Sequence, residues 1–523
     1  MKTYLRPLFA AAIAFTITAA SASEKTNVVG TSSGPVQGTV DGPVAKFLGI
    51  PFAAPPIGAL RWQPPRDPPS WTQTLVAEKF GSACAQPGLG AFAAPSDAED
   101  CLYINVFAPK DLPSSDGRPV MIWFYGGGLF AGASNDYDGG KLAAQGDVVV
   151  VTFNYRLGAF GFFSHPAIDG EGHPFANYGI MDQQFALQWV RRNIAAFGGD
   201  PRNVTIFGQS AGAASVIANL VSPLSAGLFH RAIIQSSSAL RPSVPATVMT
   251  KAAQDFAAAA GCADQSAACL RSLPAATILA RQWPVVLIAA NNSLLVDGTV
   301  MTQPTLDAFK TGHFNRTPIL TGITRDEQAF FMPETNIAPV PNAGKPLNAD
   351  EYDRFLTTFG PAFTDKLRVR YPITDFPSPS VAQIEVTQKS RVCGARISDE
   401  LWSRHVPVYA YQFNDRTAPS YFKPLSYPMG AYHTSELQYL FPFFPISAGT
   451  APPLNAAQSV LSDRMISLWA NFARTGVPSA DWAPYSAAKA NVMVLDLPAP
   501  KMISNYGEDA DCELWDSILA PSR

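Results

Sequence analysis

The chain has 523 residues, of which 47% are hydrophobic and 15% are charged, and its formal net charge is −3. A disordered chain would carry more charge and fewer apolar residues, so this composition predicts a large folded core. The sequence holds no run of five or more basic residues, which argues against nucleic acid as a partner.

The N-terminal segment has the features of a secretory signal. Lys2 and Arg6 precede an apolar run over residues 8–20, and the small residues Ala20-Ser21-Ala22 form a cleavage site. The run is too short to span a bilayer, so we expect no stable membrane insertion. We therefore predict a signal peptide over residues 1–22 and export to the periplasm or the extracellular medium.

Residues 23–523 show short apolar, β-rich runs that alternate with helix-like segments. Residues 148–155 are apolar on both faces, as expected of a central strand covered by helices on each side. Residues 240–314 and 332–395 hold few strand signals, and we expect helical insertions there. Strands that alternate with helices, without a clean linker, predict one α/β domain with a large, mostly parallel sheet. The strand candidates are residues 120–125, 148–155, 204–207, 232–235, 319–323, 408–413 and 492–497.

The pentapeptide Gly208-Gln209-Ser210-Ala211-Gly212 has the pattern G-x-S-x-G. It follows the strand candidate 204–207 and precedes a helix-like segment, which is the setting of a nucleophile elbow. Side chains at the two glycine positions would collide with neighbours in such a tight turn. The alternative is a helix start at which the serine is only a capping residue. We interpret Ser210 as a nucleophile.

A glycine run, Gly126-Gly127-Gly128, follows the strand candidate 120–125. Glycines allow a backbone to approach a reacting group closely, so the amides of Gly127 and Gly128 can donate to an oxyanion. The amide of Ala211, directly after the serine, would complete this oxyanion hole. A flexible loop needed only for turning is the alternative.

A serine nucleophile needs a base and an acid, which follow it in the chain order Ser, acid, His in this type of fold. That order excludes His165 and His173 as the base. His433 lies in a loop after the strand candidate 408–413, whereas the remaining histidines flank apolar runs and are better explained as structural: His230, His313 and His405. For the acid, local reasoning leaves Asp326 and Glu327 open, since both follow the strand candidate 319–323.

Six cysteines follow the signal segment, and an even number in an exported chain indicates disulfides. Sequence neighbours suggest two pairs and leave a third: Cys84–Cys101, Cys262–Cys269 and Cys393–Cys512. No CxxC or HxxxH spacing is present, so we expect no metal site.

Seven segments together resemble the type-B carboxylesterases, the family that includes cholinesterases and several microbial lipases and esterases. The resemblance covers most of the mature chain, and the set is highly specific. The segments are FGGDPRNVTIFGQSAG from Phe197, EDCLYINVFAP from Glu99, GIPFAAPPIGALRW from Gly49, NYRLGAFGFF from Asn154, GITRDEQAFF from Gly322, GAYHTSELQYLF from Gly430 and ARTGVP from Ala473.

The resemblance implies an α/β-hydrolase fold with helical insertions over an active-site gorge. It also implies that Glu327 is the triad acid, that His433 is the base, and that Ser236 supports the acid from behind. The three disulfides of the family match the pairs given above. A small-molecule ester would be the substrate, and no cofactor would be required.

Two departures set the chain apart from cholinesterases. Those enzymes hold choline with a tryptophan in the first disulfide loop, and no tryptophan lies between Cys84 and Cys101. They also carry glutamate before the nucleophile, where this chain has the neutral Gln209. A cation needs aromatic faces or negative charge nearby, so we do not expect choline esters as substrates.

Three functions follow as hypotheses: a serine ester hydrolase, a lipase of the same chemistry, and a non-catalytic adhesion protein of the same fold. A lipase would need an apolar lid, for which the loop 89–92 is the candidate. Comparing rates on emulsified long-chain esters and soluble short-chain esters separates the first two. The sequence leaves the acyl group, the alcohol and the oligomeric state open.

Overall fold

A computed structural model describes residues 24–90, 92–111, 116–240, 244–290, 294–337, 343–442, 444–445 and 451–519. The predicted signal peptide, 1–22, lies outside these residues. Within them, twelve strands form one sheet in the order β1-β4-β5-β7-β9-β8-β10-β11-β12-β13-β14-β15. Three short strands form a second sheet: β2 (Val29–Gly30), β3 (Pro35–Gln37) and β6 (Leu75–Val76).

The middle of the large sheet is parallel. All neighbours from β9 to β14 in that order pair in parallel, and β10 pairs with β8 on one side and β11 on the other. Their residues are almost all buried, as helices on both faces require. These strands are β8 (Arg118–Phe124), β9 (Val149–Phe153), β10 (Gly199–Gln209), β11 (Arg231–Gln235), β12 (Ile319–Thr324), β13 (Val408–Phe413) and β14 (Val492–Leu495). All seven predicted strands are therefore confirmed.

Antiparallel strands extend the sheet at both edges, and the sequence analysis did not predict them. In β5 the burial pattern mixes buried and half-buried positions, so the strand lacks the continuous apolar run of the centre. These antiparallel strands are β1 (Glu24–Lys25), β4 (Thr39–Asp41), β5 (Val44–Pro51), β7 (Tyr103–Pro109) and β15 (Lys501–Ile503).

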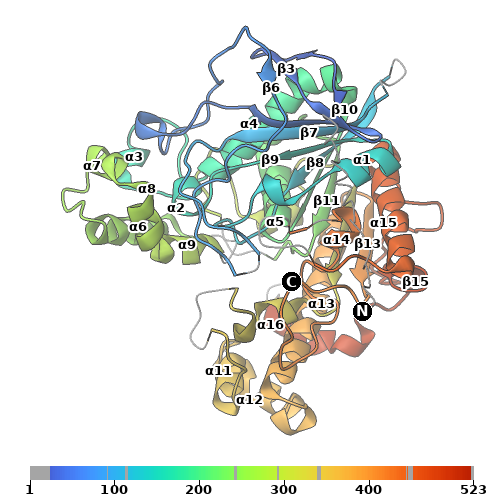
Figure 1. Ribbon diagram of the computed structural model, residues 1–523. Coiled ribbons are helices and arrows are strands. Elements are labelled where there is room, and N and C mark those ends of the chain that lie inside the picture. The colour runs from blue at the N-terminus through green and yellow to red at the C-terminus, as the bar shows by residue number, and fades with distance from the viewer. Residues whose placement is uncertain are drawn as a thin grey trace, which may run out of the picture.

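Two groups of helices enclose the sheet (Figure 1). One group contacts β8 and β10 through α15, and the other contacts the same two strands through α5, so the sheet lies between them. The first group contains α1 (Gly140–Gly146), α14 (Leu437–Leu440) and α15 (Ala456–Thr475); the second contains α4 (Tyr178–Asn193), α5 (Ala211–Val221) and α10 (Thr305–Thr311). Two short helices, α2 (Gly158–Gly161) and α3 (Pro166–Asp169), follow β9.

The two predicted insertions are helical. They project from the sheet as separate lobes, one carrying α6 to α9 and the other α11 and α12 (Figure 1). The long helix α13 connects the second lobe to the sheet, because it contacts both α11 and β12. The helices are α6 (Ala246–Ala259), α7 (Ala267–Ser272), α8 (Ala275–Arg281), α9 (Trp283–Ala290), α11 (Ala349–Thr357), α12 (Pro361–Arg370), α13 (Pro379–Ser403) and α16 (Cys512–Leu519).

The three disulfides join the pairs that the sequence suggested: Cys84–Cys101, Cys262–Cys269 and Cys393–Cys512. The last pair spans 119 residues and ties α16 to α13, which pack against each other. Closing so long a loop restricts the unfolded chain strongly, which stabilises the fold.

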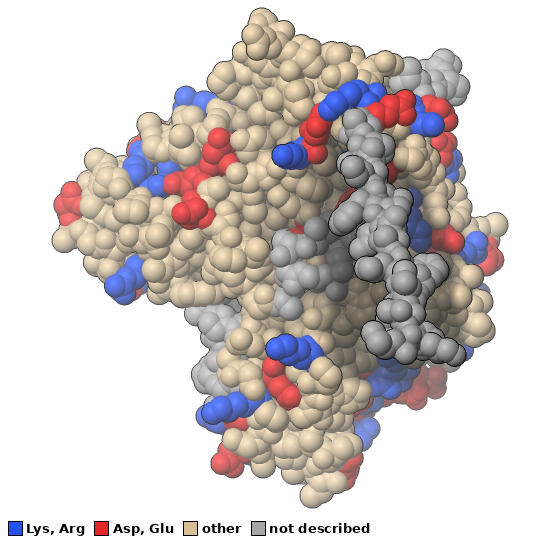
Figure 2. All heavy atoms as spheres, in the orientation of Figure 1, with Lys and Arg blue, Asp and Glu red and all other residues tan. Residues whose placement is uncertain are grey.

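The described helices include none that is both long and apolar enough to cross a membrane. Among the same residues, no group of three or more His, Cys, Asp or Glu side chains could hold a metal ion. On the face shown in Figure 2, basic side chains lie beside acidic ones, and uncharged atoms make up most of the surface.

Candidate active site

Ser210 sits in the sharp turn between β10 and α5. Its backbone has φ 58° and ψ −123°, a conformation that residues other than glycine rarely adopt. A side-chain carbon at Gly208 would lie 2.6 Å from the backbone of Gly212, and one at Gly212 would collide with the carbonyl oxygen of Phe124. The strand–turn–helix setting is therefore present, and the turn requires both glycines for steric reasons.

The glycine loop after β8 packs directly beside this turn. A side-chain carbon at Gly126 would lie 3.1 Å from Cβ of Ser210. Gly127 and Gly128 have φ angles of 108° and 64°, and in the described part of the chain their amides donate to no backbone carbonyl. Ala211 is the first residue of α5, so its amide has no acceptor within the helix. These amides are thus available to a ligand beside Ser210.

His433 and Glu327 meet in the core, although 106 residues separate them in the chain. Nδ1 of His433 forms a very short hydrogen bond with Oε2 of Glu327, and Oε1 of Glu327 accepts one from the amide of Thr324 at 2.9 Å. Burial alone would raise the pKa of Glu327. The charge and hydrogen bond of His433 outweigh burial and, with smaller effects of Arg391 and Ser236, lower that pKa to about 2. Glu327 is therefore ionised at neutral pH, so Nδ1 is the donor in this bond.

The neighbouring acid, Asp326, has a different place. Its carboxylate accepts hydrogen bonds from Nε of Arg416 at 3.0 Å and from the amide of Ala431 at 2.8 Å. Ala431 lies two residues before His433, so Asp326 holds the loop that carries the imidazole. The structure brings Glu327, and not Asp326, to His433, as the resemblance implied.

Gln209 also contacts the imidazole. Its Nε2 lies 3.1 Å from Nε2 of His433. Because Nδ1 carries the proton shared with Glu327, Nε2 of His433 is the acceptor and the Gln209 amide is the donor. The described residues show no hydrogen bond between Ser210 and His433. The Gln209 amide therefore uses the lone pair of Nε2 with which His433, acting as a base, would accept the serine proton.

Ser236 lies directly after β11, in a left-handed conformation with φ 56°. Its amide donates to the carbonyl oxygen of Gly322 at 2.7 Å, which fixes it behind Glu327. The hydroxyl is buried, forms no hydrogen bond with the described residues, and lies close enough to Glu327 to help lower its pKa. This position agrees with the role that the resemblance implied.

A cavity of about 370 Å³ joins these groups. Ser210, Glu327 and His433 line it together with Phe331, whose ring centroid is 4.7 Å from that of the imidazole. The other described residues of the lining are Ser236, Ser237, Ser238, Leu240, Ile323, Ser390, Arg391, Gly394, Ala395 and Leu519. Among them only His433 is a histidine; His230 instead accepts a hydrogen bond from the amide of Val204 at 3.1 Å.

The model of the carboxylesterase family matches residues 25–515. The chain belongs to the carboxylesterase family. It is 35% identical over 502 residues to a para-nitrobenzyl esterase of Bacillus subtilis (strain 168), an alignment that covers 90% of this chain and 94% of that protein. It is also 35% identical over 468 residues to a cocaine esterase of Oryctolagus cuniculus, covering 85% and 86% of the two chains.

Solved structures of esterases share the fold of this chain. A thermophilic PNB esterase superposes with a TM-score of 0.78 at 30% identity, covering 93% of this chain and 99% of that chain. A second PNB esterase reaches 0.77 at 31% identity, with the same coverage. The carboxylesterase therefore has the α/β-hydrolase fold and is a carboxylic ester hydrolase.

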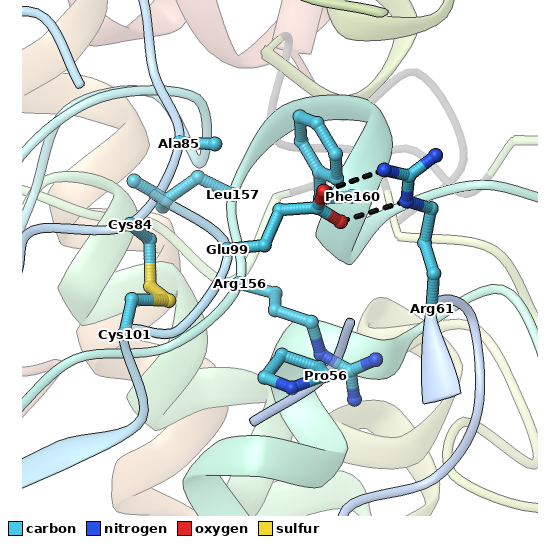
Figure 3. A pocket seen from close by; sticks show the side chains of 9 residues that line it. All are labelled: Pro56, Arg61, Cys84, Ala85, Glu99, Cys101, Arg156, Leu157 and Phe160. Carbon is cyan, nitrogen blue, oxygen red and sulfur yellow. Dashed lines mark hydrogen bonds and ion pairs between the residues drawn. A yellow bond between two sulfur atoms is a disulfide. The ribbon is translucent and has the colours of Figure 1, made fainter. Parts of the chain in front are cut away.

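A second, small cavity lies where the segment EDCLYINVFAP meets the segment GIPFAAPPIGALRW (Figure 3). It measures about 10 Å³ and lies beside the Cys84–Cys101 disulfide. Nε of Arg61 donates to Oε2 of Glu99 at 2.7 Å, and Nη1 of Arg61 donates to the carbonyl oxygen of Leu273 at 2.7 Å. Two motifs of this carboxylesterase thus meet in a buried ion pair, and the hydrogen bond from Arg61 to Leu273 ties these N-terminal loops to the α6–α9 lobe.

The sequence did not identify three residues at or near the site: Arg391, Glu436 and, as a hydrogen-bond partner of His433, Gln209. Gln209 was noted only as a departure from cholinesterases. Arg391 lies inside α13 and belongs to no sequence motif. The one signal near it is Cys393, two residues later, which was predicted to form a disulfide. In the lid candidate, the side chains of Leu89 and Phe92 are buried, and residue 91 lies outside the described residues.

Glu436 is a buried acid three residues after His433. Burial, followed by the negative charge of Glu327, raises the pKa of Glu436 to about 8, although a hydrogen bond from Nε2 of Gln235 to its Oε1 at 3.3 Å opposes the shift. The native carboxylesterase therefore holds this proton more tightly than the unfolded chain. Glu436 contributes stability that is complete below its ordinary pKa of about 4.5 and is lost as the pH rises through about 8.

Glu436→Gln should remove this pH dependence, because glutamine imitates the protonated acid. We expect the melting temperature of the variant, relative to wild type, to be higher at about pH 9 than at about pH 5. Melting curves of both proteins across this range measure the difference. Glu385→Gln, at an exposed position of α13, is the control and should show a constant difference. A constant difference for Glu436→Gln as well would contradict the assignment.

Proposed function

We propose that this carboxylesterase is an exported serine hydrolase that cleaves carboxylic esters through an acyl-enzyme intermediate, with Ser210, His433 and Glu327 as its catalytic triad. One observation carries the proposal. An ionised Glu327 holds the imidazole of His433 in the same cavity that Ser210 enters from a strained turn.

In the proposed mechanism His433 removes the proton of the Ser210 hydroxyl while the oxygen attacks the ester carbonyl. The amides of Gly127, Gly128 and Ala211 would stabilise the resulting oxyanion. The carbon–oxygen bond to the alcohol then breaks, and His433 passes its proton to the departing alcohol. Water attacks the acyl-enzyme in the same way and releases the acid, while Glu327 stays ionised and fixes the ring.

The Gln209 amide must give way for this reaction to begin. Nε2 of His433 has one lone pair, which accepts from the Gln209 amide at 3.1 Å in the structure. We propose that the Ser210 hydroxyl replaces this donor when an ester occupies the cavity. In the structure the Gln209 amide is the hydrogen-bond partner of this buried nitrogen.

Export is supported by the cysteines as well as by the N-terminal segment. All six form disulfides, and such bonds persist in oxidising compartments such as the periplasm and the extracellular medium. We propose a signal peptide over residues 1–22 and a single mature domain over 23–523.

Two measurements on the purified chain test the proposal. It should hydrolyse a soluble, neutral short-chain ester, and a fluorophosphonate should become attached to Ser210 as the phosphorus–fluorine bond breaks. Peptide mass mapping locates the modified serine, and heat-denatured protein serves as the control. Labelling of another serine, or no labelling of the folded chain, would overturn the assignment of the nucleophile.

A further inference from the structure

Arg391 brings a positive charge into the reaction cavity. It lies on α13 and lines the same cavity as Ser210 and His433. Its contacts are few: Nη2 donates to Oε1 of Gln328 at a distance of 3.4 Å, and the guanidinium carbon lies 5.3 Å from the centre of the Phe331 ring. Nε is buried and forms no hydrogen bond with the described residues.

This guanidinium also lacks an ion pair within 4.0 Å among the described residues, although Glu327 is the other fixed charge of the cavity. Both oxygens of Glu327 already accept hydrogen bonds, from Thr324 and His433. Burial lowers the pKa of Arg391 and the charge of Glu327 acts in the opposite direction, but an arginine stays charged throughout the ordinary pH range. Arg391 as a whole is half-buried, and a charge that is partly removed from water is costly unless an anion pairs with it.

The remaining walls show what kind of anion would fit. Serine side chains at four positions line the cavity together with apolar ones. A guanidinium suits a carboxylate because it can bind both carboxylate oxygens at once, and the serine side chains make the wall beside it polar. Apolar walls suit the carbon chain between that carboxylate and the ester. The serines are Ser236, Ser237, Ser238 and Ser390, and the apolar residues include Leu240, Ile323, Phe331 and Leu519.

We propose that this carboxylesterase selects esters that carry a second, free carboxylate, such as half-esters of dicarboxylic acids, and that Arg391 binds this carboxylate. The inference rests on the proposed function of the cavity. Hydrolysis of a half-ester breaks the bond between the acyl carbon and the alcohol oxygen. Water supplies a hydroxyl to the acyl carbon and a proton to the alcohol, while the second carboxylate stays unchanged.

The test compares pairs of substrates that differ only in their far end, which is a carboxylate in one and a methyl group in the other. Monomethyl esters of linear four- to eight-carbon diacids are measured against methyl esters of monoacids of equal chain length. A second series carries the carboxylate on the alcohol side, as acetyl esters of hydroxy acids. In the matching series, wild type should favour the charged ester by about 10- to 100-fold in kcat/KM, the effect expected of hydrogen bonds between charged groups.

Two variants test whether the preference for the charged ester depends on Arg391. Arg391→Met should reduce the ratio of charged to neutral ester to about one or below, mainly through a higher KM for the charged ester, and Arg391→Lys should retain part of it. Lys389→Met is the matched control, because it removes a positive charge from the same helix outside the cavity lining. It should keep the wild-type ratio. Circular dichroism and melting curves check that each variant folds.

Several outcomes would overturn the inference. Equal losses on charged and neutral esters in Arg391→Met would mean that Arg391 only supports Glu327, and a wild-type preference for neutral esters in both series would exclude an anion site. Inhibition of wild-type turnover by free dicarboxylates needs no variant and should exceed inhibition by monocarboxylates. If no ester is cleaved, the proposed function fails, and calorimetric binding of the same dicarboxylates to wild type and Arg391→Met decides the anion site separately.

Discussion

Ser210→Ala should lower kcat for a soluble ester by about 10⁵-fold or more, because loss of the nucleophile removes the acyl-enzyme route as a whole. KM should change little, since the cavity walls and the proposed oxyanion donors remain. Alanine is slightly smaller than serine, so the fold should be retained despite the unusual backbone angles at this position. Initial rates on a short-chain ester and the yield of fluorophosphonate labelling measure the effect.

Ser459→Ala is a suitable control, because Ser459 lies on α15 and is absent from the cavity lining. It should keep wild-type rates and labelling. Residual activity of Ser210→Ala within about tenfold of wild type would contradict the assignment, since removing a triad serine is far more damaging than that. Melting curves separate a chemical loss from an unfolded variant.

Glu327→Gln should lower kcat by about 10⁴-fold while leaving the shape of the cavity nearly unchanged. The ionised carboxylate of Glu327 accepts the Nδ1 proton of His433, which leaves Nε2 free to act as a base. A glutamine amide can donate to Nδ1 instead and so favour the tautomer that carries its proton on Nε2. That tautomer cannot accept the Ser210 proton. The rate of fluorophosphonate labelling should fall together with kcat, because both require an activated serine.

Asp326→Asn provides the matched control for the acid. Asp326 has the same charge and is the adjacent residue, but it contacts Arg416 and the amide of Ala431, not the imidazole. We expect a lower melting temperature and a much smaller loss of kcat than in Glu327→Gln. A larger catalytic loss in Asp326→Asn would reverse the assignment of the two acids.

The sequence predicted the central sheet well because its strands are buried on both faces. Residues 408–413 form β13 with the predicted bounds, and all of them are buried. The antiparallel strands were missed because one face or one end is half-exposed and the apolar run is interrupted, as in β5. Periodicity indicates a strand only where the environment is uniform along it.

Within the candidate site, local sequence identified those residues whose function depends on backbone geometry. The glycines around Ser210 and in the loop after β8 predict tight turns in which other residues would clash, and the structure contains both turns. Residues that act only through their side chains carried weaker signals. Nothing local separated Asp326 from Glu327, and the resemblance alone indicated which of the two would meet His433.

The amino-acid sequence by itself determined the family, the α/β architecture, the disulfide pairs and the position of the strained serine, because each depends on residue types at short spacing or on a long set of motifs. Only the tertiary structure set the Gln209 amide on the imidazole and brought Arg391 into the cavity, and it brought together Glu327 and His433, a pair that the resemblance had implied. The physical reason is that these contacts join β10, β12, the loop after β13 and α13, elements far apart in the chain that meet only when the sheet is assembled.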